Sequence, residues 1–268
     1  MTQMAGKHVL LTGGSRGLGP VLAEALARRG AHLALAARSE EGLREVADSL
    51  RGFDVKVLTV AVDLAQPAER ERLVSAVLSR FGTIDILVNN AGLETEGAFL
   101  NLSWDAIREN IEVNLVAPLA LTHLVLPRML ARGSGHVVNI ASIAAKCGGP
   151  FAATYSATKA GLAEWAQGLR LELAETGVRF STIFPGYVTE VGMFARFGLK
   201  PPLSIGSCAP AQVARAVVEA IEHDRLEVIV NSTPLRPFYA LKELSPFLGD
   251  WLLHKLGVVR FQRRKVGL

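Results

Sequence analysis

Short apolar segments alternate with helical patterns along most of the chain, and this alternation is the feature that most limits its fold. Seven segments are typical of buried strands, at residues 8–12, 31–36, 55–61, 84–89, 135–141, 178–184 and 226–230. Apolar strands that alternate with helices form parallel sheets with helices on both faces. We therefore predict one α/β domain with a doubly wound, mostly parallel seven-stranded sheet. The length of 268 residues, half of them hydrophobic, suits one such domain better than two.

A glycine-rich turn joins the first predicted strand to the first predicted helix. It has the sequence TGGSRGLG at residues 12–19. Glycines at 13, 17 and 19 allow a tight turn and let a diphosphate approach the backbone at the positive end of the helix. Such a turn alone is a weak signal. Its place between a strand and a helix favours a Rossmann-type dinucleotide site over an ordinary loop.

The end of the second strand indicates which dinucleotide would bind. A carboxylate there would accept hydrogen bonds from the adenosine ribose and repel a 2′-phosphate. This chain has Ala36-Ala37-Arg38-Ser39 instead, and Arg16 projects from the glycine-rich turn toward the same region. Two guanidiniums can pair with a phosphate, so we predict NADP(H) as the cofactor. The alternative is that both arginines are solvated surface charges.

Tyr155 and Lys159 lie four residues apart in an Ala-rich helical segment, thirteen residues after Ser142. This spacing places the two side chains on one helix face, with an ammonium beside a phenol. A charge roughly 4 Å away, at an effective dielectric of about 20, favours the phenolate by about 4 kcal/mol, or about three pKa units. We expect a tyrosine that exchanges protons near neutrality, and a Ser142 hydroxyl that holds the same substrate oxygen. The predicted chemistry is proton transfer at a carbonyl oxygen.

These motifs together resemble the short-chain dehydrogenase/reductase family over residues 5–230. The match includes the glycine-rich turn, Asp63-Leu64, NNAG at 89–92, Asn114, Ser142, YSATK at 155–159, and Pro185-Gly186. By resemblance, Tyr155 is the general acid/base, Lys159 lowers its pKa and holds the nicotinamide ribose, Ser142 orients the substrate, and Asn114 organises a water relay. The resemblance also implies a homodimer or homotetramer. It implies contacts to NADP(H) from Gly13, Ser15, Arg16, Gly17, Leu18, Gly19, Arg38, Ser39, Asp63, Leu64, Asn90, Ala91, Gly92, Tyr155, Lys159, Pro185, Gly186 and Val188.

Several of these residues also have purely structural interpretations. Asp63 could cap the following helix, a role compatible with an adenine contact. Asn90 is more typical of a side chain that braces neighbouring strand ends, and Asn114 could be a buried, hydrogen-bonded polar residue. Cys147 could line the substrate pocket, although a small core or loop thiol is the more ordinary interpretation.

The segment after Pro185-Gly186 departs from the family pattern. The family places Thr or Ser at the sixth position to bind the nicotinamide carboxamide, and here that position is Glu190, with Thr189 before it. The resemblance implies that residues 190–208 form a flap over the substrate. The apolar side chains of this flap indicate a lipophilic substrate, or equally a lid that packs on its own domain.

The chain continues past the last predicted strand into a C-terminal extension, residues 234–268. Apolar residues recur there at helical spacing, and five basic residues follow Asp250 without another acid: Lys255, Arg260, Arg263, Arg264 and Lys265. Such a helix can lie on an anionic membrane surface or pack on the protein, and packing is the more common outcome. No uncharged apolar stretch reaches the length of about 20 residues that spans a bilayer. Nucleic-acid binding is poorly supported because the basic cluster lacks a recognisable reading motif.

Histidine and cysteine patterns add little. The six histidines show no metal-ligand spacing, so we predict no metal site. Two cysteines and no secretory leader suggest a reducing compartment, and we expect a cytoplasmic protein with peripheral membrane contact as an option.

The sequence therefore predicts an NADP(H)-dependent oxidoreductase that interconverts a ketone or aldehyde and an alcohol, with a lipophilic small-molecule substrate and no nucleic-acid partner. One alternative is another reaction of the family, such as epimerisation, dehydration or enoyl reduction. Enoyl reductases space the tyrosine and lysine further apart, so YSATK favours a carbonyl enzyme. The other alternative is a non-catalytic NADP-binding module that engages a membrane or partner through the C-terminal extension.

Overall fold

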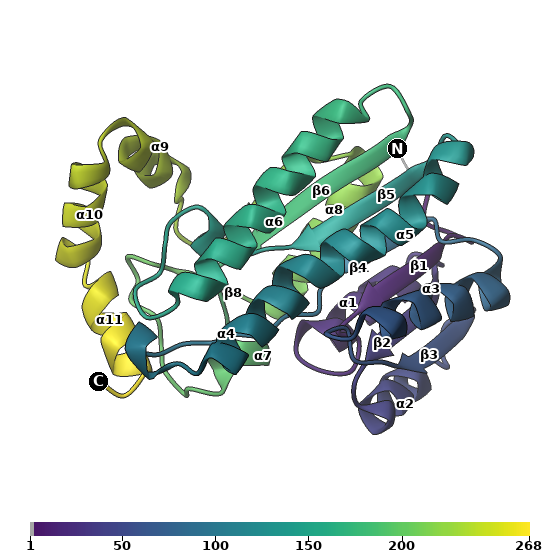
Figure 1. Ribbon diagram of the computed structural model, residues 1–268, viewed down its shortest axis with the longest axis horizontal. Coiled ribbons are helices and arrows are strands. Elements are labelled where there is room, and N and C mark those ends of the chain that lie inside the picture. The colour runs from purple at the N-terminus through teal and green to yellow at the C-terminus, as the bar shows by residue number, and fades with distance from the viewer. Residues whose placement is uncertain (1–2) are drawn as a thin grey trace.

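A computed structural model describes residues 3–268, and its centre is a parallel sheet between two layers of helices (Figure 1). The seven strands lie in the order β3-β2-β1-β4-β5-β6-β9, and every neighbouring pair is parallel. The predicted fold class is confirmed. Each strand falls within two residues of its predicted segment: β1 His8–Thr12, β2 His32–Ala37, β3 Val57–Ala61, β4 Ile86–Asn89, β5 Gly135–Ile140, β6 Val178–Pro185 and β9 Glu227–Val230.

Alternate residues of each strand face opposite helix layers. In β1, Val9 and Leu11 pack in one hydrophobic cluster, whereas Leu10 packs in the other. The first cluster includes helices α1 (Leu18–Ala27), α2 (Glu40–Ser49) and α8 (Pro210–His223). The second includes α3 (Pro67–Phe81), α5 (Ala117–Ala131) and α6 (Ala153–Glu172). Because both faces are buried, the strands are apolar throughout rather than alternating.

A long helix runs from Trp104 to Ala131 and packs on one face of the sheet. It consists of α4 (Trp104–Ile111), one π-helical turn η2 (Glu112–Val116) and α5. By length and composition it could cross a membrane. Its residues Leu121, Val125 and Met129 are instead buried against the sheet, so we interpret it as a core helix.

Short elements surround the carboxyl ends of the strands. They are the 3₁₀ turns η1 (Phe99–Asn101) and η3 (Ile143–Ala145), the two-stranded pair β7 (Tyr187–Val188) and β8 (Ser207–Cys208), and helix α7 (Gly192–Ala195). The predicted flap, residues 190–208, contains α7 and β8. It packs on its own domain through Phe194, whose ring lies 4.6 Å from that of Tyr187.

The C-terminal extension forms three helices, α9 (Arg236–Leu244), α10 (Pro246–Lys255) and α11 (Val258–Lys265). Figure 1 shows α9 and α10 standing away from the sheet at the left, and α11 returning toward the segment before α4. The predicted self-packing holds for α11, where Gln262 and Lys265 are buried. Helices α9 and α10 leave Leu244 85% and Phe247 82% exposed. Membrane contact of the extension, the less common outcome considered above, stays an untested alternative.

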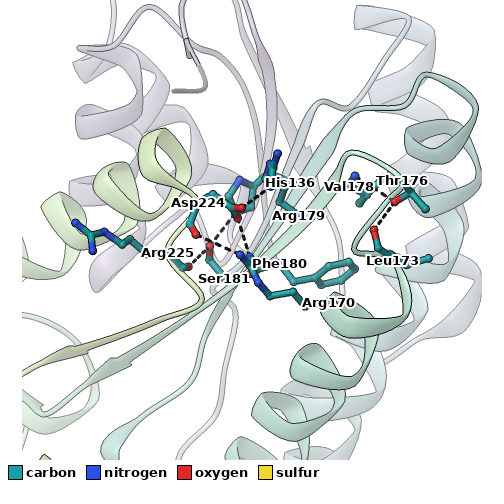
Figure 2. Close-up of polar contacts among 10 residues, drawn as sticks. All are labelled: His136, Arg170, Leu173, Thr176, Val178, Arg179, Phe180, Ser181, Asp224 and Arg225. Atoms are coloured by element: carbon teal, nitrogen blue, oxygen red, sulfur yellow. Dashed lines mark hydrogen bonds and ion pairs between the residues drawn. The ribbon is translucent and has the colours of Figure 1, made fainter.

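A polar cluster fastens the loop after α8 to the starts of β5 and β6 (Figure 2). Asp224 pairs with Arg170 at 2.7 Å and also with Arg179. The Ser181 hydroxyl donates to the Arg225 carbonyl at 2.6 Å and contacts Nε2 of buried His136 at 2.8 Å. The cluster lies near the amino ends of the strands, so we interpret it as a contribution to the stability of the fold at that edge of the sheet. It is remote from the carboxyl ends of the strands.

Candidate active site

A cavity of about 760 Å³ opens at the carboxyl ends of the strands. Such sheets bind ligands at this edge. Two of the predicted site residues, Asn114 and Gly19, do not line it. The predicted site residues that line it are Gly13, Ser15, Arg16, Gly17, Leu18, Arg38, Ser39, Asp63, Leu64, Asn90, Ala91, Gly92, Ser142, Tyr155, Lys159, Pro185, Gly186 and Val188.

The glycine-rich turn forms one end of the cavity and requires its glycines. Gly13 and Gly17 have φ angles of +66° and +64°, a region that side chains disfavour. A Cβ atom on Gly19 would lie 2.1 Å from the Gly13 carbonyl oxygen. Helix α1 begins at Leu18, and no side chain caps its start. An anion at this position would meet backbone amides and the positive end of the helix, which fits a diphosphate.

Asn90 braces the strand ends that carry this turn, as predicted. Its side-chain amide donates to the carbonyls of Thr12 at 3.0 Å and Gly13 at 3.2 Å. The Thr12 hydroxyl accepts from the backbone N–H groups of Asn90 and Ala91, both at 3.0 Å. These bonds join the ends of β1 and β4, and so hold the turn against the NNAG segment.

Asp63 does not cap the next helix, so the capping interpretation considered above does not hold. Its carboxylate accepts from the Ala65 N–H at 3.0 Å, while α3 begins only at Pro67 after Gln66. The chain makes a local side-chain turn first, which places Asp63 at the cavity instead. Ser39, by contrast, caps α2 by accepting from the Gly42 N–H at 3.1 Å.

Two arginines lie at the adenosine end predicted for the cofactor. Arg16 and Arg38 both line the cavity, and both side chains are exposed. Arg38 lies 3.3 Å from Glu109, an exposed pair of low energetic value. The guanidiniums therefore stand at the rim, where they remain available to a phosphate.

Ser142, Tyr155 and Lys159 meet at the other end of the cavity. The Lys159 ammonium donates to the Ile140 carbonyl at 2.9 Å and lies 5.8 Å from the centre of the Tyr155 ring. Burial lowers the pKa of Lys159 to about 8. Ser142 follows β5 and Tyr155 lies in the first turn of α6, so the strand end and the helix start bring the two hydroxyls together.

The groups around Tyr155 act on its pKa in both directions. Burial and the charges of Glu94 and Glu96 raise its pKa well above its usual range, although a hydrogen bond with Ser142 acts in the opposite direction. The Lys159 ammonium donates to the Ile140 carbonyl and lies 5.8 Å from the centre of the Tyr155 ring, so its expected effect on the phenol stays a prediction. At neutral pH the phenol is therefore protonated.

Asn114 lies in the π-helical turn and is fully buried. Its carboxamide accepts from the Leu93 N–H at 2.7 Å and donates to the Leu93 carbonyl at 2.8 Å. It also donates to Asn110 at 3.1 Å. The π turn, a feature often found at functional sites, thus fixes the segment that follows NNAG. This hydrogen-bonding role is the structural one considered above, and the water relay stays a prediction.

A family model described as short chain dehydrogenase matches residues 7–200. This is most of the chain. The chain belongs to the short-chain dehydrogenase family.

Curated relatives extend this family assignment. A ketoacyl reductase, HetN, from a Nostoc species is 40% identical over 99% of this chain and 94% of its own. A putative ketoacyl reductase from Streptomyces coelicolor is 40% identical over 67% of this chain and 69% of its own.

Two solved structures share the fold of this short-chain dehydrogenase. A metagenomic short-chain oxidoreductase in complex with NADP has a TM-score of 0.74, with 29% identity over 87% of this chain and 100% of that one. An alcohol dehydrogenase from Thermococcus sibiricus complexed with 5-hydroxy-NADP has a TM-score of 0.75, with 31% identity over 85% of this chain and 97% of that one.

The departure from the family pattern at Glu190 has a structural counterpart. Glu190 is exposed with a φ of +71°, and the Thr189 hydroxyl contacts the Cys208 carbonyl at 3.4 Å. Neither residue lines the cavity, whereas Val188 and Val191 do. The usual side-chain contact to a carboxamide is therefore not provided by either residue in this conformation.

Sequence reasoning missed several cavity residues that come from distant parts of the chain. Glu94, Glu96, Tyr187 and Lys265 all line the cavity, as do residues of all three helices of the C-terminal extension or the turns beside them. Cys147 lines it too, so the pocket interpretation applies to that loop thiol. No local pattern marks these residues, since they meet only through the tertiary fold. Across residues 3–268, no group of three or more His, Cys, Asp and Glu side chains could hold a metal ion.

Proposed function

We propose that this short-chain dehydrogenase is an NADP(H)-dependent oxidoreductase that interconverts a lipophilic ketone or aldehyde and an alcohol. One observation carries the proposal. A single cavity has the glycine-rich turn and two arginines at one end, and Ser142, Tyr155 and Lys159 at the other. The NADP complexes named among the structural neighbours support the choice of cofactor.

When bound, NADP(H) would supply or accept the hydride. The glycine-rich turn would hold its diphosphate, Arg16 and Arg38 its 2′-phosphate, and Lys159 its nicotinamide ribose. Ser142 would hold the substrate oxygen by a hydrogen bond. Tyr155 would donate the proton to that oxygen during reduction, because its phenol is protonated at neutral pH.

The lining of the substrate end supports a lipophilic substrate. The flap contributes Met193, Phe194 and Ile205 to the cavity, and the C-terminal extension adds further apolar side chains. Apolar pockets with a few polar groups bind small molecules in this manner. The ketoacyl reductase names of the two relatives are consistent with a carbonyl on an acyl chain and with a role in lipid metabolism.

The test is turnover of a panel of lipophilic ketones and aldehydes, followed by nucleotide absorbance with NADPH and with NADH. We expect NADPH to be preferred and Tyr155→Phe to lower kcat at least 100-fold, since general acid catalysis typically contributes that much. Tyr155→Phe should still be stabilised against heat by NADPH, which separates lost chemistry from lost folding. A preference for NADH, or full activity of the variant, would refute the proposal.

A non-catalytic NADP-binding module is the second hypothesis, and an epimerase or dehydratase is the third. The exposed Leu244 and Phe247 favour the module, because they offer the C-terminal extension a contact surface. The enclosed Ser142 and Tyr155 argue against it. The module would bind NADPH without turnover and sediment with liposomes only when residues 234–268 are present. An epimerase or dehydratase would transform a substrate without a net change in nucleotide absorbance.

A further inference from the structure

Lys265, three residues before Leu268 in helix α11, is buried between two carboxylates. Its ammonium lies 2.8 Å from Glu94 and 2.7 Å from Glu96, and its side chain is only 1% exposed. Glu96 is 7% exposed. Burying an unpaired charge is expensive, so a lysine reaches this position only because the carboxylates compensate it. The three side chains, called here the Lys265 cluster, therefore depend on one another.

Aromatic rings surround the same ammonium. It lies 4.7 Å from the ring centre of Phe197 and 5.6 Å from those of Tyr187 and Phe194. Cations over aromatic faces are attracted to them, more strongly when desolvated. Lys265 thereby joins three segments: the loop after β4, the strand β7, and the flap.

Helix α11 presents one face to the substrate end of the cavity. Val258, Gln262 and Lys265 recur at helical spacing and all line the cavity, while Arg263 and Arg264 on the same helix are exposed. Phe261 adds an edge contact to Tyr187 at 5.5 Å. The wall is continued by apolar residues of the preceding turn and helices: Leu235, Phe238, Leu253 and Leu256.

We propose that the Lys265 cluster fastens α11 as the outer wall of the substrate pocket, which makes Lys265 a positioning residue and selects carbonyl substrates that carry an extended apolar chain. The inference rests on the proposed oxidoreductase function. Since the ammonium is already matched by Glu94 and Glu96, the wall offers no spare positive charge to an anionic substrate. Its free contact surface is apolar.

The cluster also borders the reacting groups. Glu94 follows Leu93, whose N–H and carbonyl are both held by Asn114. The charges of Glu94 and Glu96 act on Tyr155, and burial together with Glu94 raises the pKa of Glu96 to about 7. The charged and titratable groups that face the cluster are thus Tyr155 and Tyr187, with Lys159 beyond them. Loss of the ammonium would disturb both the wall and the field at the phenol.

The test compares Lys265→Met with Arg264→Met, which removes an exposed charge from the same helix. Substrates are unbranched 2-alkanones of increasing length, with NADPH as reductant. For the wild type we expect kcat/KM to rise with chain length. Lys265→Met should flatten this dependence and raise KM for the longest ketone at least tenfold, while the KM for NADPH changes less than twofold. Arg264→Met should behave as the wild type, and Lys265→Arg should recover part of the length dependence.

Hydrogen exchange of the α11 amides gives a readout that needs no turnover. Exchange should be at least tenfold faster in Lys265→Met than in Arg264→Met, because opening of the helix is governed by the contacts that hold it. Unchanged exchange together with an unchanged length dependence would overturn the inference. If the wild type reduces no ketone but exchange of the α11 amides is still faster in Lys265→Met, the role of Lys265 in holding α11 is supported. The proposed oxidoreductase function is then refuted. Release of the helix without loss of length selectivity would refute the specificity role.

Discussion

His136 makes the stability of the fold sensitive to acid, because its buried ring has no partner for a second proton within residues 3–268. The ring is 2% exposed at the polar cluster of Figure 2. The Ser181 hydroxyl donates its hydrogen bond to the Arg225 carbonyl, so it can only accept one from His136. The hydrogen of the neutral imidazole therefore lies on Nε2. Nδ1 is buried and has no hydrogen-bond partner among the described residues. A second proton there would add a buried charge near Arg170 and Arg179.

Burial, opposed by Asp224, accordingly lowers the pKa of His136 from 6.5 to about 4. The unfolded chain binds a proton below pH 6.5, and the folded protein does so only below about pH 4. Stability is therefore lost as the pH falls between these values. The loss from His136 is about 2 kcal/mol at pH 5 and reaches about 3 kcal/mol once the pH is below both pKa values.

Urea unfolding at pH 7.5 and pH 5 measures this loss. His136→Gln keeps an amide donor for Ser181 and removes the titration, so its stability should fall about 2 kcal/mol less than that of the wild type between the two pH values. His254→Gln, at an exposed histidine, serves as the control and should match the wild type. An equal acid response in His136→Gln and the wild type would refute the assignment of a neutral, buried imidazole.

Two further predictions concern the cofactor and the π-helical turn. Arg38→Leu should raise the KM for NADPH about tenfold, because a charge-assisted hydrogen bond to phosphate contributes at least that factor. The KM for NADH should stay unchanged. Equal effects on both nucleotides in steady-state kinetics would contradict a 2′-phosphate contact. Asn114→Ala should lower the free energy of unfolding by about 2 kcal/mol, since it removes the hydrogen-bond partner of the part-buried N–H and carbonyl of Leu93. Urea denaturation with less than about 1 kcal/mol of loss would show that the loop is fixed by other contacts.

The strands and the cofactor end could be predicted from the sequence because their signals are local. A run such as Leu33 to Ala36 is apolar at every position, which a strand covered on both faces requires. Gly13 and Gly19 occupy positions where a side chain would strain the backbone or collide with it. Steric necessity leaves a mark in the sequence that needs no knowledge of distant residues. Asp63 shows the limit of this reasoning, because capping and turn formation use the same residue types.

The substrate end could not be predicted in the same way. The four-residue step from Tyr155 to Lys159 indicates a shared helix face, but the pKa of the phenol depends first on its burial and then on the charges of Glu94 and Glu96, which come from another segment. Lys265 contacts Glu94 and Glu96, which precede it in the chain by 171 and 169 positions. As part of a basic, amphipathic segment it is indistinguishable in sequence from Arg263 and Arg264, which are solvated. Only the tertiary fold decides which cation is buried.

Substrate specificity within the family should depend on the segment that follows the last strand. An open parallel sheet supplies the cofactor end from its own strand termini, but it leaves the outer side of the substrate end to whatever segment follows. The metagenomic oxidoreductase aligns over its full length yet covers 87% of this chain, whereas the Nostoc HetN alignment extends over 99% of it and so includes the C-terminal extension. If α11 is the wall of the substrate pocket, selectivity for an apolar chain should follow the extension rather than the shared sheet. Proteins with the same catalytic residues and a different segment after β9 would then reduce different carbonyl compounds.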